Sequence, residues 1–93
     1  MSDKVSIDSL DDLIRFRDHL RSFNDKLGDD FHSIRAHWGE LGESWQDDRY
    51  SQFGQALGEV TQGIERYLHA SDEYEQYLLT LIERLRTVLE TRL

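Results

Sequence analysis

Apolar side chains in the first half of the chain recur at the spacing of an α-helix. Leu13, Leu20, Leu27, Ile34 and Leu41 lie seven residues apart, and the aromatic residues between them fall at intervals of three and four. This spacing places the apolar side chains along one stripe of a helix. Ser9 stands where an N-cap is needed. The pattern predicts one long helix from about residue 10 to about residue 41.

The second half has two rows of mostly apolar residues with a seven-residue period. The first, which we term the Tyr50 row, is Tyr50, Leu57, Ile64, Ser71, Leu78 and Leu85, and the second, the Phe53 row, is Phe53, Val60, Tyr67, Tyr74, Leu81 and Val88. The rows interleave at intervals of three and four, which predicts a helix over about residues 45–91 with both rows on one seam. Ser71 is the only polar member of the two rows.

Small and capping residues gather between the two predicted helices. Gly39 and Gly42 lie where a left-handed C-cap commonly ends a helix. Ser44, followed three residues later by Asp47, has the spacing of a capping box that starts the next helix. The turn is therefore predicted within about residues 39–44, and the two helices form an antiparallel hairpin.

Bulky and small residues follow this turn in close succession. Trp45 falls in the first turn of the second helix, where its indole can plug the end of the hairpin and fix the angle between the helices. Gly54 and Gly58 lie inside that helix, where each glycine costs roughly 1 kcal/mol relative to alanine. These glycines either permit a close helix approach, make room for a side chain such as Trp38 or Phe31, or are tolerated without a packing role.

The two predicted helices differ in length. At 1.5 Å per residue they span roughly 48 Å and 70 Å, so roughly fifteen C-terminal residues project beyond the first helix unless residues 4–7 cover part of them. An exposed aliphatic segment of this size calls for a partner, and a second copy would complete a four-helix bundle. The expected dimer-interface residues are Leu78, Leu81, Ile82, Leu85, Val88 and Leu89.

Composition restricts the classes of partner. The 93 residues carry 11 Lys and Arg against 19 Asp and Glu, a formal net charge of −8, so the surface is acidic and repels both nucleic acid and anionic membranes. The chain has no cysteine and therefore no disulfide framework. We expect no membrane-spanning segment and no classical signal peptide, because the sequence shows neither an apolar window long enough to span a bilayer nor an N-terminal apolar h-region. We expect a single domain over residues 1–93, located in the cytoplasm or exported by a route that needs no signal peptide.

The sequence offers little catalytic chemistry. The four histidines are not arranged as a HExxH motif, and neither a phosphate-binding loop nor a nucleophile elbow is present. A di-iron site in a helical bundle needs Glu-x-x-His pairs facing inward, and this chain contains none. We expect no enzyme activity, no cofactor and no metal, with a bundle enzyme or metal carrier as a remote alternative.

Two long helices joined at a central tryptophan resemble the WxG-hundred, or ESAT-type, family of type VII secretion. That family has a Trp-x-Gly turn and an aromatic residue eight positions after the tryptophan. Here Trp45 occupies the turn and Phe53 supplies the later aromatic, whereas Asp47 stands in place of the motif glycine. The family's C-terminal Tyr-x-x-x-Asp/Glu export signal is missing. The resemblance implies that Trp45, Asp47 and Phe53 belong to a surface that secretion machinery recognises.

The resulting expectation is a protein that acts through protein–protein interaction. It would be a type VII-like secretion substrate or a chaperone-like partner of one, forming a homodimer or a heterodimer with a related hairpin. The secretion machinery or a larger secreted effector would be a further partner, and the partner chain could carry the missing export signal. The alternative is an intracellular coiled-coil adaptor with no link to secretion.

Overall fold

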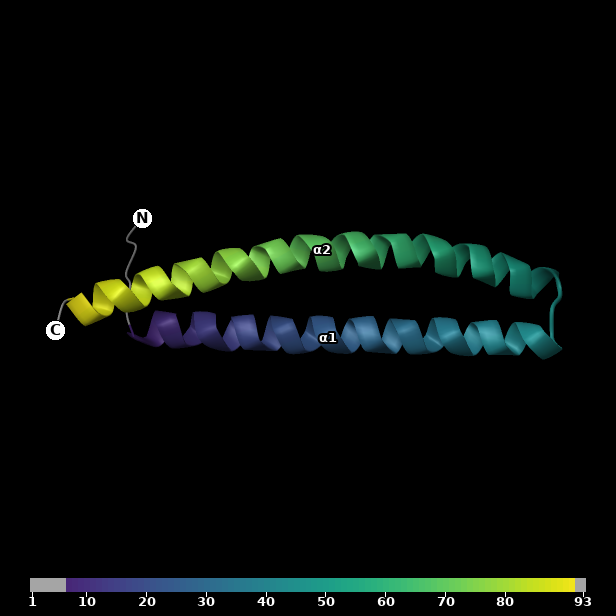
Figure 1. Ribbon diagram of the computed structural model, residues 1–93, viewed down its shortest axis with the longest axis horizontal. Coiled ribbons are helices and arrows are strands. Elements are labelled where there is room, and N and C mark those ends of the chain that lie inside the picture. Colours follow the sequence, from purple (N-terminus) through teal and green to yellow (C-terminus); the bar gives the residue numbers. More distant parts are fainter. Residues whose placement is uncertain (1–6, 92–93) are drawn as a thin grey trace.

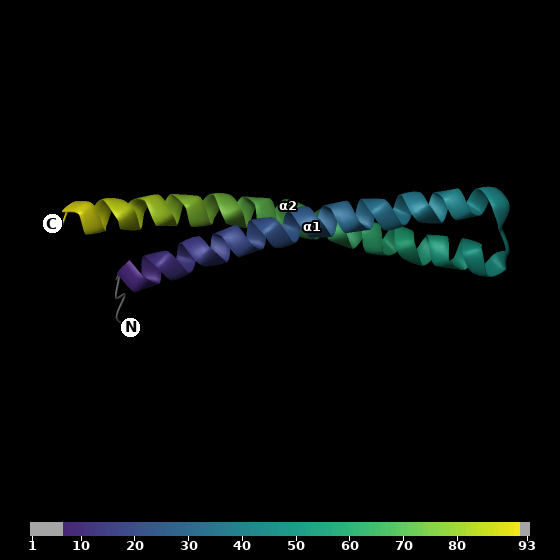
Figure 2. The same cartoon turned by 90° about the horizontal axis from the view of Figure 1, so that it is seen from below.

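A computed structural model describes residues 7–91, without the side chain of Ile7. Helix α1 spans Ile7–Ser44 (38 residues) and helix α2 spans Asp48–Thr91 (44 residues). The helices run antiparallel along the long axis of a particle measuring 67 × 22 × 16 Å (Figure 1). The view in Figure 2 shows that they cross near their middles. The predicted two-helix hairpin is confirmed.

The ends of the helices differ from the prediction. Helix α1 continues through Gly39 and Gly42 to Ser44, and no described residue has a positive φ, so the predicted left-handed C-cap is wrong. Ser44 belongs to the last turn of α1 and does not cap α2. Ser9 likewise lies inside α1, because the helix begins before it. The connection consists of the three residues 45–47, and Asp47 caps α2.

The seam between the helices follows one of the two predicted rows of α2. Members of the Tyr50 row are buried or half-buried, with Leu78 only 2% exposed. The Phe53 row, apart from the half-buried Leu81, is exposed, so its predicted place in the seam is wrong. A third row, each member four residues after one of the Tyr50 row, takes that place; it consists of Gly54, Thr61, Leu68, Glu75, Ile82 and Leu89.

At the open end of the hairpin, helix α1 extends further along α2 than the predicted overhang assumed. Helix α1 starts earlier than predicted, and Leu10, Leu78 and Ile82 are buried within the chain. Leu78 and Ile82 are therefore not free to meet a second chain, as the predicted dimer interface required. An interface at the C-terminal end stays a prediction for the exposed Val88 and the half-buried Leu81, Leu85 and Leu89.

Candidate functional site: the hairpin tip and an exposed apolar face

A stacked aromatic pair closes the tip of the hairpin. The rings of Trp38 on α1 and Tyr50 on α2 lie 4.4 Å apart at an interplanar angle of 6°. The Tyr50 hydroxyl also donates a hydrogen bond of 2.9 Å to the backbone carbonyl of Trp38. This pair, and not Trp45, is the plug that fixes the separation of the helices at this end.

Two glycines provide the space that the stacked pair needs. A Cβ atom at Gly54 would lie 2.8 Å from Cη2 of Trp38, and one at Gly42 would lie 2.7 Å from Cζ of Tyr50. Both separations are too short for carbon atoms, so each ring occupies volume that only glycine leaves empty. Three roles were considered for the glycines of α2, and for Gly54 the structure supports the second, which is making room for Trp38. At Gly58 an added Cβ would meet nothing within 4 Å.

Trp45 is presented to solvent. Its side chain is 62% exposed, so the predicted plug is wrong for this residue. Its indole N–H donates to Oδ2 of Asp47 over 3.3 Å, while Oδ1 of the same carboxylate accepts the backbone N–H of Tyr50 at 2.8 Å. Asp47 therefore caps the first turn of α2 and holds the Trp45 ring at the tip.

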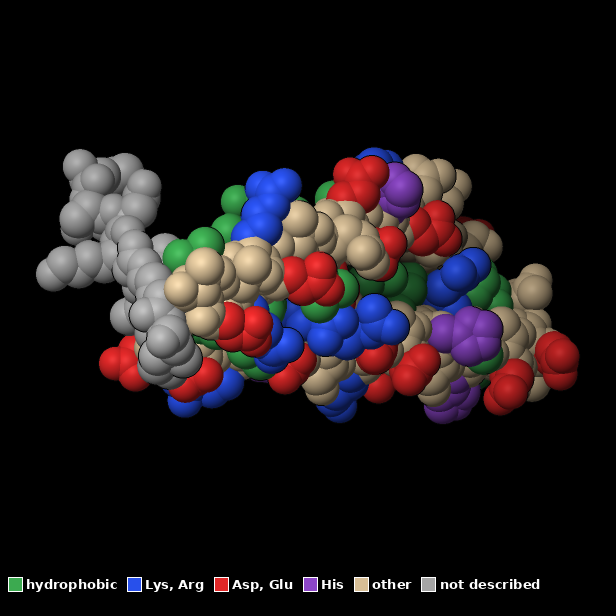
Figure 3. All heavy atoms as spheres, turned by 60° about the vertical axis from the view of Figure 1, so that its left-hand side comes forward, with side chains coloured by type: hydrophobic (Ala, Val, Ile, Leu, Met, Phe, Trp, Pro, Cys, Tyr) green, Lys and Arg blue, Asp and Glu red, His purple; other side chains and the backbone are tan. Residues whose placement is uncertain are grey.

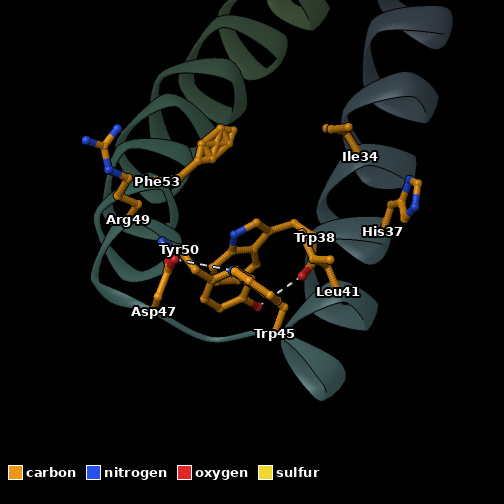
Figure 4. Close-up of a pocket in the computed structure, with 9 residues that line it drawn as sticks. All are labelled: Ile34, His37, Trp38, Leu41, Trp45, Asp47, Arg49, Tyr50 and Phe53. Carbon is orange, nitrogen blue, oxygen red and sulfur yellow. Dashed lines mark hydrogen bonds between the residues drawn. The ribbon is translucent and has the colours of Figure 1, made fainter.

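A pocket of about 460 Å³ opens beside these residues. Ile34 and Phe53 face each other across its opening, with the rings of Trp38, Trp45 and Tyr50 grouped at the tip (Figure 4). The Trp38 Nε1 atom is buried without a hydrogen-bond partner. The pocket is lined mainly by apolar side chains, and it brings the predicted motif residues Trp45, Asp47 and Phe53 together.

Exposed apolar side chains continue from this pocket along one side of the hairpin. We term this surface the apolar face and define it as Phe16, Phe23, Ile34 and Leu41 of α1 with Phe53, Val60, Tyr67, Tyr74 and Val88 of α2. At about 100° per residue, the α1 members share one flank of their helix, as the α2 members share another. Ile34 and Leu41 line the same pocket as Phe53, so both flanks lie on the same side of the hairpin.

The other side of the seam is polar. A second pocket there is lined by Arg21, Asp25 and Asp29 of α1 and by Leu68 and Asp72, among others. In the space-filling view of Figure 3, acidic, basic and histidine side chains are interspersed over both helices. The two sides of the hairpin therefore differ in character, and the apolar face is the one suited to contact another protein.

A buried group of polar side chains crosses the seam near the middle of both helices. The Asn24 amide donates to Oγ of Ser71 at 2.6 Å and to Oε2 of Glu75 at 3.4 Å, and its oxygen accepts the Tyr67 hydroxyl at 2.9 Å. Nη1 of Arg21 lies 3.6 Å from Oε1 of Glu75. We term these five residues the polar cluster; Asn24, Ser71 and Glu75 are buried.

The described residues contain no group of three or more His, Cys, Asp or Glu side chains placed to hold a metal ion. Over the same residues, neither helix is long and apolar enough to cross a membrane. The surface of the hairpin combines an apolar face with a tip that carries an exposed indole, and the polar cluster lies between the helices.

Sequence reasoning located the tip but missed the apolar face and the polar cluster. Trp45, Asp47 and Phe53 lie close together as the motif implied, whereas the role of Trp38 was only one of three alternatives for the glycines. The sequence contains both sets: an apolar residue lies three positions after each member of the Tyr50 row, and the residues four positions after it are Gly54, Thr61, Leu68, Glu75, Ile82 and Leu89. Asn24 on the other helix was the available signal that the second set could be buried.

Compared with protein-family models, curated proteins and solved structures, the chain shows no match.

Proposed function

We propose that the protein is a non-enzymatic helical hairpin that pairs with a second hairpin through its apolar face, as a type VII-like secretion substrate or a chaperone-like partner of one. The observation that carries the proposal is the apolar face itself. Nine large side chains, each 40–52% exposed, run along one side of the molecule. A half-exposed side chain of this size leaves on the order of 100 Å² of its surface in contact with solvent. Their total, on the order of 800 Å², is the area that one partner contributes to a standard interface.

A second copy of the chain is the simplest occupant. Two hairpins that bury the same face against each other form a four-helix bundle with a two-fold axis. This arrangement covers the apolar side chains of both copies and leaves the polar sides in water. It also supplies the core that a single seam lacks, since only three large hydrophobic residues of the described chain are buried.

The link to secretion is supported by the tip. By resemblance, the tryptophan of the turn belongs to a surface that secretion machinery recognises, and Trp45 is exposed there beside Phe53. Asp47 in place of the motif glycine is compatible with that role, because aspartate and glycine are both favoured at N-caps. The alternative, a coiled-coil adaptor unrelated to secretion, uses the same apolar face but has no need of the exposed indole.

Sedimentation equilibrium of three proteins tests the pairing. The wild-type chain should form a dimer of roughly 22 kDa from two 11.0 kDa chains at micromolar concentration. Val60→Glu with Tyr74→Glu places two carboxylates on the apolar face and should weaken the dimer at least about a hundredfold. Gln55→Glu with Gln76→Glu adds the same charge to exposed polar positions and should leave the dimer unchanged.

A wild-type chain that remains monomeric at micromolar concentration would reject the homodimer and direct the search to a different hairpin as partner. Equal dissociation constants for the two double variants would reject the apolar face as the interface. Loss of export with Trp45→Ala in a cell that exports the protein, at an unchanged dimer constant, would favour secretion over the adaptor.

A further inference from the structure

Helix α2 could form its seam with α1 in two ways. Each member of the Tyr50 row is followed by one residue at the third position and another at the fourth, and these lie on opposite flanks of it, about 100° apart around the helix. The seam therefore uses the Tyr50 row either with the Phe53 row or with the row that starts at Gly54. A rotation of α2 by about 50°, half the angle between those rows, exchanges one arrangement for the other.

The arrangement in the structure is not the one that hydrophobicity favours near the middle of the helices. Glu75 is only 4% exposed, whereas its neighbour Tyr74 is 49% exposed. Glutamate is almost never fully buried unless it is paired, and tyrosine is buried far more readily. Something other than hydrophobicity must therefore favour this rotation of α2.

The polar cluster provides that preference. In the observed rotation the Asn24 amide reaches Ser71 and Glu75, and Arg21 lies beside the same carboxylate. Tyr67, at the edge of the seam, donates to the Asn24 oxygen. A rotation that carried Glu75 outward would remove its contact with Asn24 and bring tyrosine rings against a buried amide.

We propose that the polar cluster fixes the rotation of α2 about its axis and thereby keeps the Phe53 row, with its tyrosines, on the outside of the hairpin. Asn24 is the main positioning residue, because it contacts three members of the cluster on α2. The polar cluster thus determines which surface the hairpin presents. The part of the proposal that concerns a partner rests on the proposed function, whereas the rotation itself can be measured in one chain.

A cross-link within the chain reports the rotation. The sequence has no cysteine, so an introduced pair is the only thiol pair present. A Cβ at Gly28 would lie 4.0 Å from Cδ1 of Leu68, which belongs to the row that starts at Gly54. Positions 28 and 68 therefore face each other, and a thiol cross-linker only a few ångströms long should join Gly28→Cys to Leu68→Cys within one chain. Rotation toward the Phe53 row swings position 68 away. Mass spectrometry separates this link from one between chains, so dimer formation does not affect the measurement.

The cysteine pair is compared in three backgrounds, each checked for helicity by circular dichroism. Asn24→Leu leaves Glu75 without its amide donor and should slow intramolecular linking about tenfold, since an unsatisfied buried polar group shifts an equilibrium by roughly five- to a hundredfold. Asn24→Leu with Glu75→Leu also removes the carboxyl group that had lost its donor, so α2 no longer gains by rotating. The linking rate should return to within about threefold of the unmodified background. A restored rate would not follow if Asn24 acted only by packing locally.

A second variant covers the case in which Asn24→Leu does not fold. Asn24→Leu with Ser71→Leu makes the part of the seam common to both arrangements apolar, so the hairpin should stay helical while Glu75 still lacks its donor. Linking should again slow about tenfold. An unchanged rate in either folded variant would overturn the proposed role of the polar cluster. That result would leave the dimer measurement above untouched, so failure of one proposal is distinguishable from failure of the other.

Discussion

Trp38 and Trp45 lie seven residues apart in the sequence, but their surroundings assign them different roles. Trp38 is stacked on Tyr50 and fills the space above Gly54. Trp45 contacts the Asp47 carboxylate and is otherwise largely open to solvent. Helical spacing alone places both indoles on one stripe, so the sequence could not distinguish them. The difference arises because α1 extends past Trp38 and ends just before Trp45.

Truncating each tryptophan should therefore have unequal effects on stability. Trp38→Ala removes the stacked ring and opens a void against Gly54, so it should lower the free energy of unfolding by about 2–4 kcal/mol. Trp45→Ala removes an exposed side chain and one exposed hydrogen bond, so the loss should stay below about 1 kcal/mol. Urea denaturation followed by circular dichroism measures both values. Equal losses would mean that Trp45 is packed in solution.

The glycines of α2 give a second test at the residue scale. Alanine at a helix interior is favoured over glycine by roughly 1 kcal/mol. Gly58→Ala meets open space and should raise the free energy of unfolding by about 0.5–1 kcal/mol. Gly54→Ala gains the same propensity but drives a methyl group into the Trp38 ring, so it should lower stability by about 1–3 kcal/mol. Opposite signs in thermal melts would support the packing at the tip, and a stabilising Gly54→Ala would contradict it.

At the scale of the helices, both elements and their antiparallel pairing followed from the sequence. Apolar residues recur with a helical period on each side of a central break, and that signal does not depend on fine detail. The exact ends did not follow, because Gly39 and Gly42 were interpreted as backbone signals. Gly42 instead lies inside α1, where it leaves space for the Tyr50 ring. A glycine required by a distant side chain and one required by a turn are indistinguishable in a sequence.

The pattern of apolar residues also could not predict how α2 is rotated about its axis. Counting hydrophobic side chains favours burying the Phe53 row, since its members are larger and more apolar than Gly54, Thr61 and Glu75. The structure buries the second set because Trp38 packs over Gly54 and Asn24 binds Glu75. Both contacts join residues that are distant in sequence. Predicting them requires knowing which residues of α1 lie opposite which residues of α2.

Asp47 determines how α2 begins. Its carboxylate accepts the Tyr50 backbone N–H, which is one of the donors that the first turn of a helix leaves unpaired. Asp47→Ala should therefore lower the free energy of unfolding by about 1 kcal/mol, whereas Asp47→Gly, which introduces the glycine of the Trp-x-Gly motif, should cost only a few tenths. Thermal melts of the two variants check this order. The reverse order would show that the cap contributes little and that backbone flexibility at position 47 dominates.

At the scale of the whole molecule, the hairpin is a two-sided rod. One side carries the apolar face, and the seam between the helices buries few large hydrophobic residues. The sequence predicted a partner that binds the C-terminal end of α2, because that prediction depended on unequal helix lengths, and it did not predict the apolar face. The rotation of α2 instead spreads the exposed side chains along nearly the whole hairpin, from Phe16 at one end to Phe53 at the tip. In the proposed dimer, an interface of that length would engage both helices of each hairpin.

The net charge of −8 gives pairing with a second copy a distinct dependence on salt. Two copies bring like charge together, so repulsion opposes the dimer at low ionic strength. Sodium chloride shortens the Debye length from roughly 30 Å at 0.01 M to roughly 10 Å at 0.1 M, which screens this repulsion. The homodimer should therefore tighten as salt rises over that range, with a dissociation constant lower by roughly three- to tenfold. Sedimentation equilibrium at both salt concentrations measures the change. A basic hairpin as the preferred partner would show the opposite trend, since its attraction to this acidic chain weakens with salt, and a homodimer that loosened with salt would contradict an interface built on the apolar face.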